Sequence, residues 1–329
     1  MLMNMREIWI ELQRAGVLVF RAASAFDGEA ISAAFDEFVV AGEVREILIR
    51  LGCGYSPSRL RPEVYASRYP YSDVAAIRAL LLQLVDAGLA EEGSHSSFSL
   101  TQKGIGEIQA WYERMALALS GPDLAGITRS EIEELIEADR EIVAFLDSNR
   151  GYHGSPVLDH RLKAVLPDFS RPALWHHHFH TWTIQAAQED EGEHVRIARD
   201  VDWIEWFVRR QLWFIDRRPW LARARTFERL AHYLESYAPI EDAEAACREA
   251  FDRLATRGEA EAHAEGLRLT PQGLTTCDGD ELEIDTNLLA RWPEWSHEKL
   301  TRLHEILDRL NARFEQIRAP NTEPQGGPT

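Results

Sequence analysis

The chain contains little cysteine and no long apolar run. Three cysteines, Cys53, Cys247 and Cys277, stand singly among 329 residues, and none belongs to a Cys-x-x-Cys pair. This spacing excludes a disulfide-stabilised scaffold and a zinc ribbon, and a reducing compartment is the simplest expectation. No apolar stretch approaches the roughly 20 residues of a membrane-spanning helix, and the N-terminus shows no signal pattern. We therefore expect a cytoplasmic protein without membrane contact.

The motifs of several enzyme classes are absent as well. The sequence contains no Gly-x-Ser-x-Gly, no glycine-rich phosphate loop and no His-Glu-x-x-His. These are the patterns of α/β-hydrolases, nucleotide-binding proteins and zinc proteases. We therefore assign no catalytic residue. An enzyme stays among the alternatives, because a carboxylate acid–base site leaves little trace in a sequence.

Positive charge is scarce, most of all near the C-terminus. The chain holds 36 Lys+Arg and 54 Asp+Glu, a net charge of -18. Residues 1–120 hold 11 and 15, a net of -4, whereas residues 226–329 hold 11 and 21, a net of -10. Because cations that neutralise phosphates supply much of the affinity for nucleic acid, the C-terminal third is a poor candidate for DNA contact.

One pattern occurs twice. In the first copy an apolar helix stops at Gly88, and Leu100-Thr101-Gln102-Lys103-Gly104 follows. In the second copy the helix stops at Gly258, and Leu269-Thr270-Pro271-Gln272-Gly273 follows. Each first Gly favours a helix end, and each Thr is a good N-cap for the next helix. The repeat predicts a helix, a glycine stop, a short two-stranded ribbon and a second helix in both places.

This arrangement resembles the winged helix-turn-helix superfamily, in which the helix before the glycine is the recognition helix and the ribbon is the wing. The resemblance covers about residues 60–118 and 224–285. It implies a mainly α fold with small β wings, in which two winged-helix-like units flank a helical domain. It also implies a transcriptional regulator of the bacterial type that binds double-stranded DNA.

We expect three domains and a tail. Residues 1–120 would hold N-terminal helices and the first winged-helix domain, and residues 121–223 a helical domain rich in Trp, His and Arg. Residues 224–318 would hold the second winged-helix-like unit and a C-terminal helix, and the Pro- and Gly-rich residues 319–329 would be disordered. Within the middle domain, Ser130-Glu131-Ile132-Glu133 predicts a capping box, and Glu189-Asp190-Glu191-Gly192 predicts a break between two helices.

Arginines gather around the first predicted recognition helix. Residues 45–78 contain six arginines against three acids, a net charge of +3. Arg suits both guanine edges and phosphates. The residues expected to contact DNA are Arg59, Arg61, Arg68, Tyr71, Ser72, Arg78, His95 and Lys103. The alternative is that the arginines pair with nearby carboxylates.

Two departures from a DNA-binding pattern accompany this expectation. The first wing, residues 91–97, contains no Lys or Arg. The second predicted recognition helix, residues 241–251, contains four acids and one Arg. Since acids repel phosphate, we expect the second unit to serve packing or protein contact.

Histidines cluster in the middle domain. His176 and His180 lie four residues apart and can share one helix face, a geometry that binds divalent metal ions. The sequence places no third or fourth ligand. The alternative is a neutral histidine face beside aromatic packing.

Tryptophans recur in the same domain at helical spacing. Trp206 and Trp213 lie seven residues apart, with Trp203 one turn earlier and arginines between them. This stripe predicts a pocket for a small-molecule effector, lined by Trp203, Trp206, Trp213 and Arg210. An aromatic and Arg-rich surface could also stack single-stranded nucleic acid. The alternative is a core helix that buries its tryptophans and pairs its arginines outward.

The C-terminal helix has a heptad seam. Its apolar residues are spaced three and four apart, at Leu300, Leu303, Leu307, Leu310, Phe314 and Ile317. The seam predicts either a homodimer or docking on the chain's own core.

Three functions stay open on this basis. The first is a DNA-binding transcriptional regulator that uses the first winged-helix unit. The second is a winged-helix protein-interaction or scaffold module without DNA binding, because a fold does not determine a function. The third is a metal-dependent enzyme centred on residues 176–180.

Overall fold

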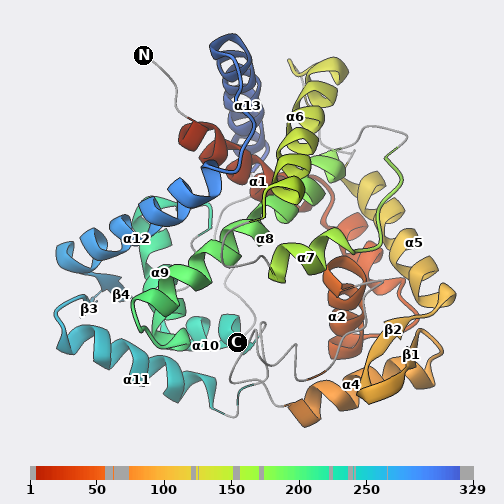
Figure 1. Ribbon diagram of the computed structural model, residues 1–329, viewed down its shortest axis with the longest axis horizontal. Helices are drawn as coiled ribbons and strands as arrows, with labels where there is room; N and C mark the ends of the chain where they lie inside the picture. The colour runs from red at the N-terminus through yellow and green to blue at the C-terminus, as the bar shows by residue number, and fades with distance from the viewer. Residues whose placement is uncertain are drawn as a thin grey trace.

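The computed structural model describes residues 5–55, 62, 74–119, 124, 126–150, 156–169, 174–221, 225–235, 240, 242–264 and 266–318. Within these residues the protein is mainly helical, with two small antiparallel sheets of two strands each (Figure 1). The predicted mainly α class with small β ribbons is thus confirmed at this level. None of the described helices is both long and apolar enough to cross a membrane. The predicted tail, residues 319–329, lies outside the described residues.

The helices and strands follow one another along the chain. The N-terminal helices are α1 (Met5–Asp36) and α2 (Gly42–Arg50), and α2 runs into a π-helical turn at Leu51–Tyr55. Next come α4 (Val74–Asp86), β1 (Ala90–Glu92), β2 (Phe98–Leu100), α5 (Gln102–Ala118), α6 (Arg129–Ser148), α7 (Pro156–Leu162) and α8 (Leu174–Ala198). The C-terminal part holds α9 (Trp203–Arg217), α10 (Phe227–Glu235), α11 (Ala243–Thr256), β3 (Ala260–His263), β4 (Gly266–Leu269), α12 (Pro271–Leu289) and α13 (His297–Arg318).

Both copies of the repeated pattern fold into the same local structure. We call α4, β1, β2 and α5 the first helix–ribbon unit, and α11, β3, β4 and α12 the second. The strands pair Ala90 with Leu100 in the first ribbon and Ala260 with Leu269 in the second. The two units lie on opposite sides of the long helix α8 (Figure 1).

A threonine joins the parts of each unit. In the first, Thr101 Oγ1 donates to Gly88 O at 2.8 Å and accepts from Gly104 N at 3.2 Å. The first-turn N–H groups of a helix lack a partner within the helix, so this cap satisfies one of them.

The second unit repeats this geometry. Thr270 Oγ1 donates to Gly258 O at 2.6 Å and accepts from Gly273 N at 3.2 Å. Gly88 and Gly258 both adopt a positive φ, 71° and 74°, which ends a helix without the strain that a Cβ would add. The helix–glycine–ribbon–helix pattern predicted from the sequence is therefore present twice.

Each unit also requires its second glycine. A Cβ at Gly104 would lie 2.1 Å from Leu89 O, and a Cβ at Gly273 would lie 2.0 Å from Glu259 O. The helix that follows each ribbon therefore packs against backbone through a residue without a side chain.

The largest core joins both ends of the chain. Residues of α1, α5, α6, α8 and α13 belong to one hydrophobic cluster, which includes Ile8, Leu135, Phe179 and Leu310. A second cluster joins α9 to α10, α11 and the second ribbon, with Leu212 and Phe251 among its members. The domain boundaries expected at residues 120, 223 and 318 stay predictions.

The heptad seam of α13 packs against α1 of the same chain. Leu303, Leu307, Leu310 and Phe314 are fully buried in the large core. Asn311 Nδ2 donates to Glu11 Oε2 of α1 at 2.8 Å beside them. Of the two alternatives that the seam predicted, docking on the chain's own core is the one that the structure shows. This docking buries the apolar residues on which the homodimer prediction was based.

The predicted break at residues 189–192 is wrong, because α8 continues to Ala198. Tertiary partners hold these polar residues inside the helix. Asp190 accepts the N–H groups of Val157 and Leu158 at the start of α7, at 2.9 and 3.0 Å. Glu191 pairs with Arg291 at 2.8 Å. The chain instead turns near Asp200, whose φ is 53°.

The capping box of α6 is also displaced from its predicted position. Thr128, not Ser130, caps the helix by accepting from Glu131 N at 3.2 Å, and Glu131 Oε2 accepts from Thr128 N at 2.9 Å. A hydrogen bond from Arg309 is the largest of the causes that lower the pKa of Glu131 to about 2. The true box is therefore also tied to α13.

Candidate functional site

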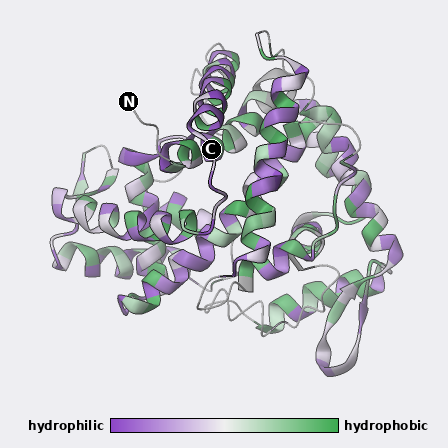
Figure 2. Cartoon of the chain, turned by 45° about the horizontal axis from the view of Figure 1, so that its top comes forward, coloured by the Kyte–Doolittle hydropathy of each residue, from purple (hydrophilic) through white to green (hydrophobic). Residues whose placement is uncertain are grey.

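The first candidate surface is the outward face of α4. Val74 and Leu82 are each 36% exposed, and Ala75 and Ala79 are exposed between them. Hydrophobic residues dominate this helix in Figure 2 as well. We call Val74, Ala75, Ala79 and Leu82 the α4 face. A major-groove helix would present cations here, whereas the α4 face is apolar and the exposed polar residues beside it on α4, Gln83 and Asp86, are neutral and acidic.

The arginine on α4 is held by its own ribbon. Arg78 Nη2 lies 2.7 Å from Glu92 Oε1, and Nη1 donates to Ser96 Oγ at 2.7 Å. Because both contacts lie on the ribbon side, this predicted DNA-contacting residue is engaged within the protein. The alternative that the arginines pair with nearby carboxylates is thus realised at Arg78.

The other predicted DNA-contacting residues divide into two groups. His95 is exposed at the ribbon tip with a φ of 59°, and Lys103 Nζ donates to Ala87 O at 2.9 Å across the end of α4. The remaining predicted residues, Arg59, Arg61, Arg68, Tyr71 and Ser72, lie outside the described residues.

The cations of the second unit are paired as well. Arg248 pairs with Glu244 one turn earlier on α11, and Arg268 pairs with Glu261 across the ribbon at 2.6 Å. Exposed pairs of this kind contribute little to stability, about 0–1 kcal/mol, but each places an acid beside the cation.

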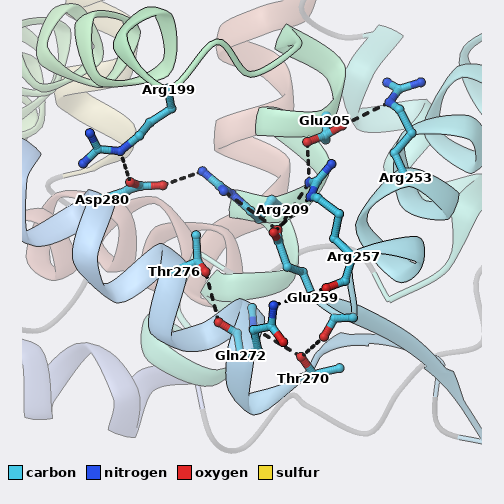
Figure 3. A network of polar contacts seen from close by, with 12 residues as sticks. Arg199, Glu205, Arg209, Arg253, Arg257, Glu259, Thr270, Gln272, Thr276 and Asp280 are labelled. Carbon is cyan, nitrogen blue, oxygen red and sulfur yellow. Dashed lines mark hydrogen bonds and ion pairs between the residues drawn. The ribbon is translucent and has the colours of Figure 1, made fainter.

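A denser network joins α11 to α9 (Figure 3). Arg253 and Arg257 both reach Glu205 of α9, at 3.0 and 2.5 Å, and Arg257 also contacts Glu259 at 3.0 Å. Glu205 is only 5% exposed, so its charge is buried between the two guanidinium groups. Both arginines at the end of α11 are therefore occupied by carboxylates of the same chain.

The arginines of α9 face the acids of α12. Arg209 lies 2.5 Å from Asp280, Arg210 lies 2.6 Å from Glu281, and Arg217 lies 2.6 Å from Asp278. Arg218 reaches Asp285 at 3.4 Å. Arg209 and Arg218 are buried, so the core-helix alternative, in which the arginines pair outward, does not hold for these two side chains. Much of the acidity of the C-terminal third thus balances arginines within the protein.

Two of the three tryptophans of the α9 stripe are buried, and Trp203 is partly buried. Trp206 is 6% exposed and Trp213 is 3% exposed, and Trp213 Nε1 donates to Asp278 at 2.9 Å. Trp203 is stacked on Phe207 with a centroid distance of 6.0 Å. These rings, and Arg210 beside them, pack as in the core-helix alternative. An effector could not reach Trp206 or Trp213 without movement of the surrounding helices.

The histidines of α8 make separate contacts. His177 Nδ1 lies 2.7 Å from Asp139 of α6, and His178 Nδ1 lies 2.7 Å from Gly16 O of α1. His176 and His180 both pack on Phe169, with centroid distances of 4.8 and 5.0 Å. The predicted metal pair is therefore buried beside an aromatic ring.

Burial governs the protonation of these histidines. Loss of solvation lowers the pKa of His178 and that of His180 to about 3, which keeps both rings neutral at pH 7. Neutral imidazole can ligate a metal, but no group of three or more His, Cys, Asp or Glu in the described parts of the chain could hold one. A metal centre at His176 and His180 lacks further ligands among these residues.

A buried polar cluster beside α8 escaped the sequence reasoning. Arg161 of α7 donates to Cys53 O and Phe179 O, and its guanidinium lies 4.1 Å from the Phe179 ring centroid. Tyr112 Oη donates to Cys53 Sγ at 3.2 Å. Burial raises the pKa of Cys53 and of Tyr112, so both stay protonated at neutral pH. No spacing in the sequence links residues 53, 112 and 161, because only the tertiary fold brings them together.

The chain matches no family model, no curated protein and no solved structure.

Proposed function

We propose that this chain is a binding protein whose two helix–ribbon units, of the winged-helix type, contact another protein, with the α4 face as the docking surface of the first unit. One observation carries the proposal. On α4, α11, both ribbons and the helix ends beside them, each described Arg or Lys is engaged by an acid or carbonyl of the same chain.

The physical reason lies in what each partner requires. DNA affinity comes largely from cations that replace counterions on phosphates, and an internally paired arginine beside a carboxylate supplies little of it. The core of a protein–protein interface is depleted of charge and rich in apolar contact. The α4 face, with Val74 and Leu82 exposed around small alanines, suits the second requirement.

Affinity capture with three forms of the full chain tests the α4 face. The forms are the wild type, Leu82→Glu on the α4 face, and Leu166→Glu as a matched control, since Leu166 is 55% exposed outside both units. We expect a protein recovered with the wild type and with Leu166→Glu but lost with Leu82→Glu. The same recovered proteins for all three forms would remove the α4 face from the interface.

A DNA-binding transcriptional regulator is the second candidate. The +3 excess of arginine over acid in residues 45–78 favours it, because Arg59, Arg61 and Arg68 add cations just before α4. In this case Arg78 would exchange Glu92 for a phosphate, which an exposed ion pair permits at small cost.

A salt titration of binding to random double-stranded DNA, followed by fluorescence anisotropy, separates the two candidates. The protein-docking proposal expects no binding at low salt. Binding that weakens steeply with salt would favour the regulator, and the double change Arg68→Ala, Arg78→Ala should then weaken binding and reduce its salt dependence.

A further inference from the structure

The second helix–ribbon unit carries a hollow between the first turn of α9 and α11. Its volume is about 280 Å³, and it is lined by Asp202, Ile204, Ile240, Ala246, Glu249 and Arg253. Ala246, Glu249 and Arg253 follow one another at helical spacing, so they share one face of α11. The hollow therefore lies on the helix that corresponds, in the repeat, to α4.

The size of the hollow limits what it can hold. Pockets for whole drug-sized ligands or cofactors begin at about 300 Å³ and enclose most of the ligand. At 280 Å³ the hollow is at the lower end of this range and open to the surface, and its volume accommodates one long side chain of a partner. Ile204, Ile240 and Ala246 provide apolar contact along which an alkyl stem can be buried.

The charge around the hollow is negative. Arg253 Nε contacts Glu205 at 3.0 Å and Nη2 contacts Asp202 at 3.2 Å, so two carboxylates already face its guanidinium (Figure 3 shows the pair with Glu205). Glu249 is exposed at the rim and pairs with no cation among the residues that the structure describes. A carboxylate is thus available to an incoming cation.

The start of α9 does not favour an anion here. Free N–H groups at a helix N-terminus attract anions. Asp202 Oδ1 accepts from Ile204 N at 3.0 Å and from Glu205 N at 3.1 Å, so the N-cap carboxylate already occupies these donors. An anionic ligand would meet Asp202 and Glu249 instead of open N–H groups.

We propose that the hollow binds a single arginine side chain from a basic segment of a partner protein. The stem lies along Ile204, Ile240 and Ala246, and the guanidinium group pairs with the Glu249 carboxylate. This inference rests on the proposed function, because it names the chemistry of a protein partner. It adds a second contact, on the opposite side of α8 from the α4 face.

Methyl NMR of the full chain with short peptides provides the test. Isoleucine methyl groups are labelled, and the protein is titrated with acetyl-Ala-Arg-Ala-amide or with the peptide in which citrulline, neutral and of equal shape, replaces arginine. We expect saturable shifts of the Ile204 and Ile240 methyls with the arginine peptide, and none at the fully buried Ile8 and Ile184. The citrulline peptide should cause no saturable shift.

Two variants test whether the Glu249 carboxylate is the group that pairs with the arginine of the peptide. Glu249→Gln should weaken binding of the arginine peptide about threefold or more, the scale of one exposed ion pair. Glu113→Gln removes an exposed carboxylate from α5, away from the hollow, and should bind as the wild type does. No saturable shift in the wild type, equal binding of the citrulline peptide, or equal losses in the two variants would each overturn the proposal. These outcomes leave the Leu82→Glu comparison unaffected, so failure of the hollow and failure of protein docking are distinguishable.

Discussion

The substitution Gly104→Ala probes the geometry that defines the helix–ribbon unit. The added Cβ would lie 2.1 Å from Leu89 O, where carbon and oxygen need about 3 Å or more. Helix α5 and the backbone at Leu89 must then separate by about 0.9 Å or more. The separation strains the hydrogen bond from Thr101 N to Leu89 O, now 3.0 Å, and the Thr101 cap of Gly104 N, now 3.2 Å.

The expected loss of stability follows from these contacts. Overpacking against backbone costs about 1–3 kcal/mol, and each weakened hydrogen bond about 1 kcal/mol. We expect Gly104→Ala to lower the free energy of unfolding by about 2–4 kcal/mol. Gly106→Ala is the matched control, since it lies in the same helix with nothing within 4 Å of its Cβ. Ala is the better helix former, so this control should gain about 0.5–1 kcal/mol.

Urea unfolding followed by tryptophan fluorescence and by circular dichroism measures both variants. Coincident transitions from the two probes are required before free energies are compared. A Gly104→Ala protein as stable as the wild type would refute the close approach of α5 to the ribbon. The repeat provides an independent copy of the experiment, because Gly273→Ala should behave as Gly104→Ala does, and Gly279→Ala as Gly106→Ala does.

Three further predictions concern the helices around α8. Burial lowers the pKa of His178 and His180 to about 3, so the stability due to their neutral forms is complete above pH 6.5 and declines as the pH falls toward 3. Urea unfolding at pH 7.5 and at pH 5 should show a loss of about 2 kcal/mol per histidine, and equal stability at both values would contradict their burial in the neutral form. Arg209→Met removes the buried guanidinium beside Asp280 and leaves only the half-exposed Arg199, 3.2 Å away, so it should cost about 2–4 kcal/mol, whereas Arg217→Met breaks an exposed pair with Asp278 and should cost under about 1 kcal/mol. Similar losses for the two arginines in thermal or urea unfolding would show that burial does not set the energy of the α9–α12 pairs. Thr128→Ala removes the observed N-cap of α6 and should cost about 1 kcal/mol, while Ser130→Ala should change the stability little. A larger loss of stability for Ser130→Ala than for Thr128→Ala in the same assay would instead support the capping box predicted at Ser130.

Features that depend on neighbours in sequence could be predicted in advance. Gly88 and Gly258 end their helices, and Thr101 and Thr270 cap the next ones, because these effects act within a few residues. For the arginines near the first predicted recognition helix, the sequence also offered pairing with carboxylates as an alternative to DNA contact, and Arg78 does pair in this way. The choice between DNA and a carboxylate depended on whether the ribbon turned Glu92 toward α4, and local rules do not determine that direction.

Features that depend on distant partners were predicted poorly. The acidic run 189–192 has the composition of a helix break, yet the N–H groups at the start of α7 and the cation of Arg291, just after α12, hold it in α8. The tryptophans of α9 suggested a pocket, but α12 provides the carboxylates that allow Arg209 and Arg218 to be buried beside them. In both cases the free energy of a polar residue was set by a partner far away in the sequence, 33 residues for Asp190 and Val157 and 71 residues for Arg209 and Asp280.

The sequence by itself determined the mainly helical class, the two repeated helix–ribbon patterns and the excess of acid over base, because helix periodicity, glycine stops, threonine caps and charge counts are local or additive properties. Only the tertiary structure decided which charges are available to a partner. Arg253 and Arg257 are cations in the sequence, but both pair with the buried carboxylate of Glu205, whereas Glu249 stays at the rim of the hollow. The interaction of two charges depends on their separation and on the solvent around them, and the packing of α9 against α11 sets both.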